Sequence, residues 1–357
     1  MAAGVAILVD VDDSVSDDAV SALADRFARH IAPLDHAFFG RPEDAGGRDF
    51  DRNGVVLVVL TSRVSSLSPQ LVGFFDRSDL VDPSDPGAPP WSNGADILFM
   101  TPPSATTTLD QVSGTIAHEY QHLINFVTKS IRLGSDPETL WLDEGLSSFA
   151  EDMAGYGQDA FENIELFLDA VPVTPLVSTV DSPELRGACH LLVRYLFEQS
   201  GGAAFEDPGG LDDRGGVAAV RRLVQSADVG QQLFTAAATG RSFSAWVSDL
   251  WVTMALDGTS FADVSCNPRF QLRDPAISSF TGFQRGIDLQ SAIPGTNIRL
   301  SGPATDPYAA AVDLPFSGNG GEVRRFRALA PVTTLTFGTD AQNAGDYDLF
   351  FRVIPLR

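Results

Sequence analysis

One pentapeptide constrains this chain more than any other feature: His118-Glu119-Tyr120-Gln121-His122. Apolar periodicity around it predicts a helix that begins near Leu109. Residues four apart on a helix project from the same side, so both imidazoles can bind one metal ion. Glu119 is then expected beside the ion rather than on it, within reach of a water molecule there. The competing interpretation is an exposed helix face with ordinary polar residues.

A catalytic zinc ion needs a third protein ligand and one coordination position left open. We favour Glu144 in the next predicted helix, because its apolar neighbours place it in a half-buried stripe where a carboxylate needs a cation. Gly145 would let a facing helix come close. Asp143 is adjacent but is expected to point elsewhere, while Glu151 returns to nearly the same helix face. A solvated acidic surface fits Glu151 and Asp152 better than Glu144.

The composition disfavours several classes of partner. The 357-residue chain has 24 Lys and Arg against 47 Asp and Glu, a formal net charge of −23, so nucleic acid and anionic membranes are poor partners. It is 44% hydrophobic, which is enough for a sizeable core. No apolar run is long enough for a transmembrane helix. Cys189 and Cys266 cannot form a disulfide scaffold; one bridge or two buried thiols both remain open.

Hydrophobic patterning divides the chain into three expected parts, which gives an α+β fold class. Residues 1–133 form a mixed α/β lobe that ends in the helix of the pentapeptide. Its expected strands cover 5–11, 55–60 and 95–100, and a helix capped by Ser16 covers 16–31. Residues 134–280 form a helical lobe. Its first expected helix has Pro137 at the first position, and the later ones cover 158–170, 184–199, 216–237 and 243–256.

The last expected part, residues 281–357, is a small all-β domain of about five strands. Short alternating apolar runs lie there between Gly, Pro and Asp turns. These runs cover 297–300, 309–314, 322–329, 333–338 and 347–354.

The pentapeptide and the segment from Trp141 to Gly157 resemble the hyicolysin family of bacterial zinc metallopeptidases, within the thermolysin-like gluzincins. The resemblance spans residues 5–200. Its other matching pieces are Ile7-Leu-Val-Asp-Val-Asp12, Asn53-Gly54 before the second strand, Gly73-Phe-Phe-Asp76, Ser92-Asn93 before the third strand, and Arg186-Gly-Ala-Cys-His-Leu-Leu-Val-Arg-Tyr-Leu196.

The resemblance implies a zinc endopeptidase with a zincin-like two-lobed fold. It implies zinc on His118, His122 and Glu144, with Glu119 as the catalytic base that takes the proton of the attacking water and delivers it to the leaving amine. The 21 residues between His122 and Glu144 exceed the gap usual in gluzincins, which a longer loop accommodates. The family also implies protein or peptide substrates and a secreted or cell-surface location. We separately expect a monomer. The N-terminus itself lacks the pattern of a secretion signal, so we expect either a cytoplasmic protein or part of a longer secreted precursor.

A further donor is expected for the oxyanion that forms during hydrolysis. Relatives typically use a histidine or tyrosine from a later helix, so we expect His190, with Tyr156, Arg186 and Tyr195 as alternatives. A packed structural histidine is the other interpretation of His190. Asp143, Ser148 and Glu151 are the candidates for side chains that contact the metal-binding histidines and orient their rings, and the sequence does not choose between them.

Residues 49–54 match the opening of a calcium loop, but position twelve is Leu60 rather than glutamate, so a turn is favoured over a calcium site. The sequence lacks the Gly-x-Met-x-Asn segment with which gluzincin aminopeptidases bind a free amine, so the resemblance implies an endopeptidase. We expect substrate to lie extended along a sheet edge near 71–76.

Two other functions stay open. One is a catalytically weak or inactive binding or adhesion protein that uses the C-terminal β domain. The other is a metal-dependent hydrolase of non-peptide substrates.

Overall fold

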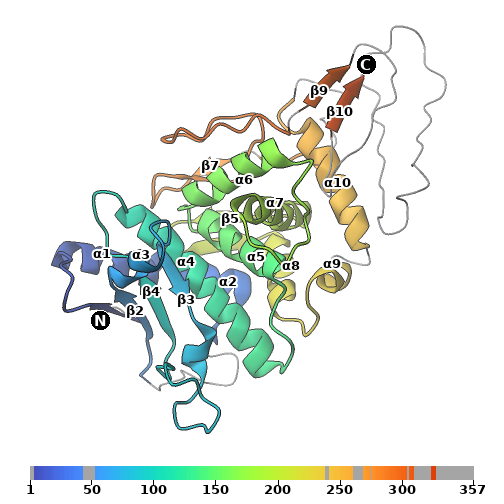
Figure 1. Ribbon diagram of the computed structural model, residues 1–357. Coiled ribbons are helices and arrows are strands. Elements are labelled where there is room, and N and C mark those ends of the chain that lie inside the picture. Colours follow the sequence, from blue (N-terminus) through green and yellow to red (C-terminus); the bar gives the residue numbers. More distant parts are fainter. Residues whose placement is uncertain are drawn as a thin grey trace.

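A four-stranded sheet forms the N-terminal side of the molecule (Figure 1). The structure, a computed structural model, describes residues 4–42, 53–237, 241–259, 268–273, 275–303, 305–308 and 323–326. The strands, in spatial order, are β1 (Val5–Val9), β2 (Val56–Leu60), β4 (Ile97–Met100) and β3 (Gly73–Phe75). β1, β2 and β4 are parallel, and β3 runs antiparallel to β4. The three expected strands are therefore present, and β3 adds an edge strand that periodicity did not predict.

Helices connect the strands of this sheet. The connection from β1 to β2 contains α1 (Asp17–Arg26), the π-helical turn η1 (Phe27–Ile31) and α2 (Ala32–Phe39). Ser16 caps α1 as predicted, because its side chain accepts a hydrogen bond from the backbone N–H of Ala19. The shorter elements between the later strands are α3 (Arg63–Leu67) and the 3₁₀ turn η3 (Arg77–Leu80).

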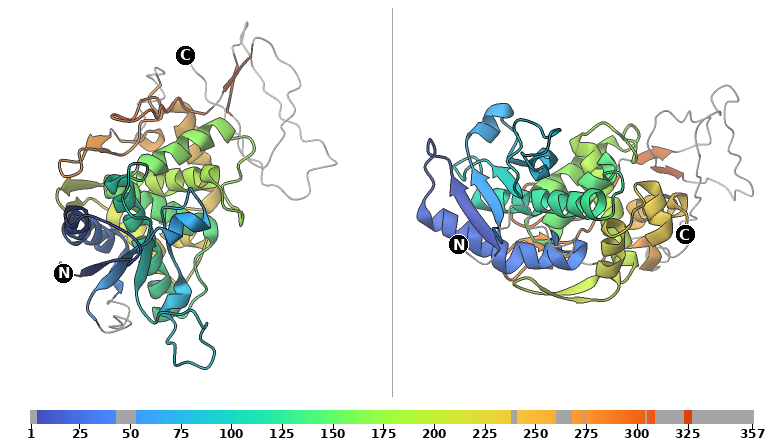
Figure 2. Two further views of the ribbon diagram at one scale, coloured as in Figure 1. Left: turned by 60° about the vertical axis from the view of Figure 1, so that its left-hand side comes forward. Right: turned by 90° about the horizontal axis from the view of Figure 1, so that it is seen from below.

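The helix of the pentapeptide lies in the middle of the molecule (Figures 1 and 2). It is α4 (Leu109–Phe126), continued by the π-helical turn η4 (Val127–Arg132). A capping box defines its start: Thr108 Oγ1 accepts from Gln111 N at 3.1 Å, and Gln111 Oε1 accepts from Thr108 N at 3.0 Å. α4 contacts β3 and β4 on one side and α5 on the other, so it joins the sheet to the helical part.

Six helices follow, and two of the predicted boundaries are wrong. Their bounds are α5 (Leu140–Met153), α6 (Gln158–Ala170), α7 (Pro183–Gln199), α8 (Gly216–Val224), α9 (Gln231–Ala237) and α10 (Phe243–Leu256). α5 begins at Leu140 instead of Pro137, because the preceding Glu138 is held in a buried ion pair with Lys129, 2.9 Å away. The helix expected over 216–237 is interrupted after α8, where the carbonyls of Ser226 and Asp228 accept hydrogen bonds from the Lys129 ammonium.

Gly145 permits a close approach of α5 and α7. A Cβ at this position would lie 2.8 Å from Cys189 Cβ and 2.9 Å from the Cys189 carbonyl oxygen. The expectation that a helix packs closely here is confirmed, and that helix is α7. Cys189 itself is buried and free, whereas Cys266 lies outside the described residues.

The remaining described elements are short and mostly strands. They are β5 (Ala203–Glu206), β6 (Gly210–Asp213), η5 (Pro268–Phe270), β7 (Ala276–Ile277), β8 (Gln284–Arg285), β9 (Thr305–Tyr308) and β10 (Val323–Phe326). Ile287, Leu289 and Leu300 pack into the same hydrophobic cluster as the sheet and helices. The expected runs at 309–314, 333–338 and 347–354 lie outside the described residues, so the all-β C-terminal domain stays a prediction.

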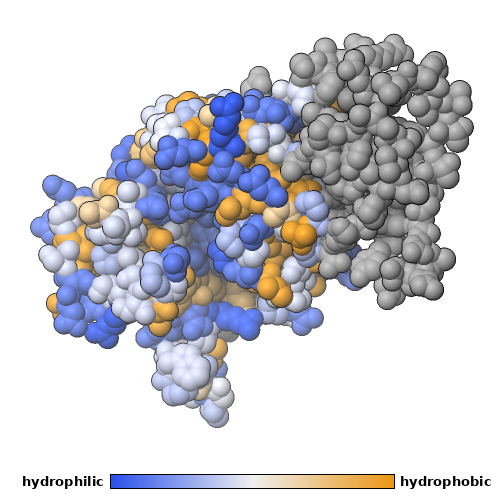
Figure 3. Space-filling model, turned by 45° about the horizontal axis from the view of Figure 1, so that its top comes forward, coloured by the Kyte–Doolittle hydropathy of each residue, from blue (hydrophilic) through white to orange (hydrophobic). Residues whose placement is uncertain are grey.

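The described part of the chain is α+β, as expected. In the space-filling view, hydrophilic residues gather where the middle of the described surface is hollowed, with apolar residues on either side (Figure 3). No helix within the described ranges combines the length and apolarity needed to cross a membrane.

Candidate metal centre

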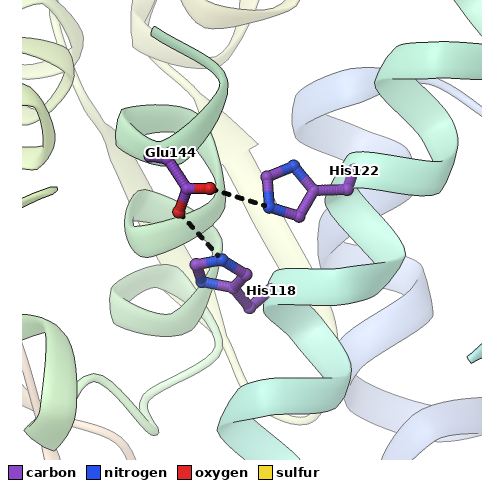
Figure 4. Close-up of side chains that lie close together, drawn as sticks. All are labelled: His118, His122 and Glu144. Atoms are coloured by element: carbon purple, nitrogen blue, oxygen red, sulfur yellow. Dashed lines mark ion pairs between the residues drawn. The ribbon is translucent and has the colours of Figure 1, made fainter. Parts of the chain in front are cut away.

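Two histidines of α4 face α5 (Figure 4). His118 and His122 lie four residues apart on this helix, and their ring centroids are 4.9 Å apart. His118 is 5% exposed, so the interpretation of this face as an ordinary solvated surface is wrong. The helical spacing brings the rings together before any tertiary contact is considered.

Glu144 of α5 completes a group that could hold a metal ion. Its Oε2 lies 3.5 Å from His118 Nε2, and its Oε1 lies 3.8 Å from His122 Nε2. The ligand atoms of the three residues all lie within 4.8 Å of one another. Within the described ranges this is the only such group of histidine, cysteine and acidic side chains.

The outer nitrogens of both imidazoles contact carboxylates. His118 Nδ1 lies 2.6 Å from Glu151 Oε1, and His122 Nδ1 lies 3.1 Å from Asp143 Oδ2. Both acids were candidates for the third ligand, but each lies behind a histidine. Carboxylates in this position orient an imidazole so that its Nε2 is directed at a metal.

Two expectations about these acids are wrong. Asp143 does not point away from the site, because it contacts His122. Glu151 and Asp152 are 8% and 0% exposed, so they do not form a solvated surface. A buried carboxylate needs a partner. Glu151 contacts His118, and Asp152 Oδ2 lies 3.0 Å from Arg194 Nη1.

The electrostatics of the group favour a cation between its members. Burial by itself would lower the pKa of His118, but Glu144 and Glu151 outweigh burial and the pKa is raised. The pKa of His122 is raised for the same reason, with Asp143 opposing the effect of burial. Burial would raise the pKa of Glu144, but the two histidines outweigh it and the pKa is lowered.

The donor set fits a zinc ion. Glu144 Oε2 is buried and makes no hydrogen bond of acceptable geometry with any described group. Two imidazole nitrogens and one carboxylate are a usual ligand set for catalytic zinc, and they leave a coordination position open.

Glu119 lies beside this group and contacts the sheet edge. It is 8% exposed, and its Oε2 accepts a hydrogen bond from Phe75 N at 2.9 Å. Because Phe75 N–H donates to Glu119, the outer edge of β3 faces this side of α4. The segment expected to bind substrate, residues 71–76, therefore lies next to Glu119.

Arg186, in the first turns of α7, also reaches the group. Its Nε lies 3.2 Å from Glu144 Oε2. Asp181 holds the same guanidinium, since Nε donates to Oδ1 at 2.8 Å and Nη2 donates to Oδ2 at 2.6 Å. The Arg186 side chain is 33% exposed.

The other three candidates for the oxyanion donor are buried elsewhere. His190 is 0% exposed; its Nε2 lies 3.2 Å from Asp152 Oδ2, and its ring stacks on Phe161. Tyr195 is also 0% exposed, and its hydroxyl donates to the carbonyl of Arg269. Tyr156 is 3% exposed, and burial raises its pKa to about 12. The environment of His190 is thus that of the packed histidine of the alternative interpretation, which disfavours it as the donor.

Sequence reasoning missed one residue beside His122. Ser147 Oγ lies 3.1 Å from His122 Nδ1 and donates to Gln121 Oε1 at 2.6 Å. The expected candidate was its neighbour Ser148, which is also buried. The signal in the sequence was a serine four residues after Asp143, on the same face of α5, where Ser147 Oγ lies 3.0 Å from the Asp143 carbonyl oxygen.

The calcium site, which the sequence already disfavours relative to a turn, gains no support. Residues 49–52 lie outside the described residues, and Asn53 Oδ1 accepts from Val55 N at 2.8 Å, as in a turn. In the acidic segment after β1, Asp10 pairs with Arg63 and Asp13 accepts from Ser62 N.

Part of this chain is similar to a known protease. No family model matches the chain. The chain is 30% identical over 150 residues to the neutral metalloprotease ShpI of Staphylococcus hyicus, which covers 40% of this chain and 32% of that protein. The chain thus spans about a third of the length of this relative. This partial similarity and the His118–His122–Glu144 group are separate observations, one from sequence and one from geometry.

Proposed function

We propose that this protein is a zinc endopeptidase of the hyicolysin type, with zinc on His118, His122 and Glu144 and with Glu119 as general base. The observation that carries the proposal is the meeting of two α4 imidazoles with the Glu144 carboxylate while Glu119, on the same helix, stays outside the ligand group. Protein or peptide substrates follow from this proposal. A monomeric state and a secreted or cell-surface location stay predictions.

Different residues of the chain have different roles in the proposed hydrolysis. When bound, zinc supplies a Lewis acid that polarises the substrate carbonyl and lowers the pKa of water. Glu119 takes a proton from the attacking water and returns it to the leaving amine nitrogen. Glu151 and Asp143 hold the two imidazoles in the orientation that a ligand needs.

The outer edge of β3 is suited to hold an extended peptide. β3 pairs only with β4 in its sheet as described, so its other edge has no neighbouring strand. Addition of a peptide strand to such an edge is a common mode of recognition. It would bring a substrate backbone past Glu119, because Glu119 already accepts from the backbone of Phe75.

Glu119→Gln tests the proposed function. The variant should keep one zinc per chain, because Glu119 is not in the ligand group, and should lose about 10²-fold or more of the rate of quenched-peptide cleavage. Zinc content is measured by elemental analysis of the purified protein. Chelation should abolish wild-type cleavage, and added zinc should restore it.

Glu162→Gln is the matched control, since it removes the same charge from an exposed position on α6 and should cleave like the wild type. Zinc-loaded wild type that cleaves no protein or peptide would overturn the proposal. So would a Glu119→Gln variant with unchanged activity.

A further inference from the structure

The guanidinium of Arg186 lies beside the ligand group, and metal binding alone does not account for its position. Arg186 Nε lies 3.2 Å from Glu144 Oε2, yet zinc ligation of Glu144 needs no cation from the protein. Among the described residues, no other lysine or arginine forms an ion pair with Glu144. A positive charge so close to a ligand competes with the metal for that carboxylate, so it calls for a function of its own.

Asp181 fixes the position of this guanidinium. Asp181 and Arg186 lie on either side of Ser182, the N-cap of α7, and the bidentate contact between them spans the first turn of the helix. This geometry restrains an arginine strongly. Nε and Nη2 donate hydrogen bonds to Asp181, whereas Nη1 donates none to a described group. The result is a fixed, partly exposed donor next to the ligand group.

We propose that Arg186 is the oxyanion donor of this peptidase, with Asp181 as its positioning residue. The inference rests on the proposed function. The ligand atoms lie within 4.8 Å of one another and Arg186 lies 3.2 Å from one of them, so a carbonyl oxygen at the group is within reach of its guanidinium. His190, Tyr156 and Tyr195 are each at most 3% exposed.

The role follows from the electron balance of hydrolysis. Water oxygen forms a bond to the carbonyl carbon, and the π pair of the carbonyl moves onto its oxygen. That oxygen gains negative charge, which a fixed guanidinium stabilises more than it stabilises the neutral carbonyl. The pair then returns, the C–N bond breaks, and the amine leaves with the proton carried by Glu119.

The charges around Arg186 favour an oxyanion over a substrate carboxylate. Arg186 already contacts two carboxylates, those of Asp181 and Glu144, so it offers little net positive charge to a free C-terminus. A preorganised donor acts at one position, which here lies beside the ligand group where the oxyanion forms. This agrees with an endopeptidase, which cleaves away from chain ends.

The test compares Arg186→Gln and Arg186→Lys with the wild type. Arg186→Gln should lower kcat by about 10²- to 10³-fold with little change in KM. Arg186→Lys, which keeps the charge but not the planar fork, should recover part of the loss. Asp181→Asn should lower kcat less than Arg186→Gln does. Each variant should retain one zinc per chain and the wild-type melting temperature within a few degrees.

A binding measurement supplies a readout that does not need turnover. A phosphonate peptide presents a tetrahedral anion like the one formed in hydrolysis, and Arg186→Gln should bind it about 10²-fold more weakly than the wild type does. In the Glu119→Gln background, the same change should leave the affinity for an uncleaved peptide nearly unchanged. Arg29→Gln is the matched control, because Arg29 forms a similar contact with Asp25 on the surface and should change neither value.

Three outcomes would overturn the inference. They are an Arg186→Gln variant with wild-type kcat and phosphonate affinity, a variant that has lost zinc, and a rise in KM confined to substrates with a free C-terminal carboxylate. A wild type that cleaves no peptide contradicts the proposed function instead. In that case the phosphonate comparison still decides whether Arg186 recognises the anion.

Discussion

At the scale of single residues, Glu151 acts on the candidate metal centre through His118. The 2.6 Å contact between Glu151 Oε1 and His118 Nδ1 holds the ring and raises its basicity. Glu151→Gln keeps an acceptor but removes the charge, so we expect zinc affinity to fall by about tenfold. Competition with a chromophoric chelator measures the affinity.

The control for this prediction is again Glu162→Gln, which removes a negative charge from the exposed face of α6. It should bind zinc like the wild type. Equal affinities for Glu151→Gln and the wild type would show that the contact does not tune the histidine.

The residues of the candidate centre differ in how far sequence could predict them. His118, His122 and Glu119 share a single helix, so local periodicity is enough to place them. Glu144 lies on a different helix, so its prediction as the third ligand also depended on its expected burial. The contacts of Arg186 and the burial of His190 both depend on how α7 packs against the other helices, which no local pattern contains.

At the scale of elements, the crossing of α5 and α7 depends on Gly145. Alanine in a helix interior usually stabilises by up to about 1 kcal/mol relative to glycine. Here the added Cβ would lie 2.9 Å from the backbone carbonyl carbon of Cys189, which cannot move aside cheaply. We therefore expect Gly145→Ala to lower the free energy of unfolding by about 1–3 kcal/mol, as measured by urea denaturation.

Gly87→Ala is the comparison for this change, because a Cβ there would meet no heavy atom within 4 Å. Its stability should stay within about 0.5 kcal/mol of the wild type. If Gly145→Ala proved as stable as the wild type or more so, helix propensity would outweigh the close contact, contrary to our expectation.

Both helix boundaries that sequence placed wrongly meet at one buried lysine. Lys129 is 0% exposed; it pairs with Glu138 and donates hydrogen bonds to the carbonyls between α8 and α9. Proline at a first helical position and an apolar stripe over 216–237 are sound local signals. They were overridden because a buried ammonium must be satisfied by groups distant in sequence.

At the scale of the whole molecule, His30 joins segments from across the chain. Its Nε2 lies 2.8 Å from the carbonyl of Ala154, at the end of α5, and its Nδ1 accepts from Gly209 N at 3.1 Å. Arg285 of β8 lies against the same ring. The N-terminal, helical and later segments therefore meet at one imidazole. The ring must be neutral for these contacts, because Nδ1 accepts a hydrogen bond from Gly209 N and a protonated ring has no acceptor nitrogen.

Acidification should destabilise the protein through His30. Burial, the largest cause, lowers the pKa of His30 from 6.5 to about 4. Its contribution to stability is complete above the unfolded value of 6.5 and falls as the pH drops from there toward about 4, because the unfolded chain binds the proton first. Between about pH 7 and pH 4.5 the loss is ~2–3 kcal/mol.

His30→Gln isolates this contribution, since its amide can donate to the Ala154 carbonyl but does not titrate. Urea denaturation of metal-free wild type and variant at several pH values measures the difference in stability, in which all other titrations cancel to first order. The wild type should exceed the variant most near pH 7, and its advantage should shrink by ~2–3 kcal/mol toward pH 4.5. A difference that stays constant over this range would mean that His30 titrates alike in the folded and unfolded chain, and that its junction tolerates the charged ring.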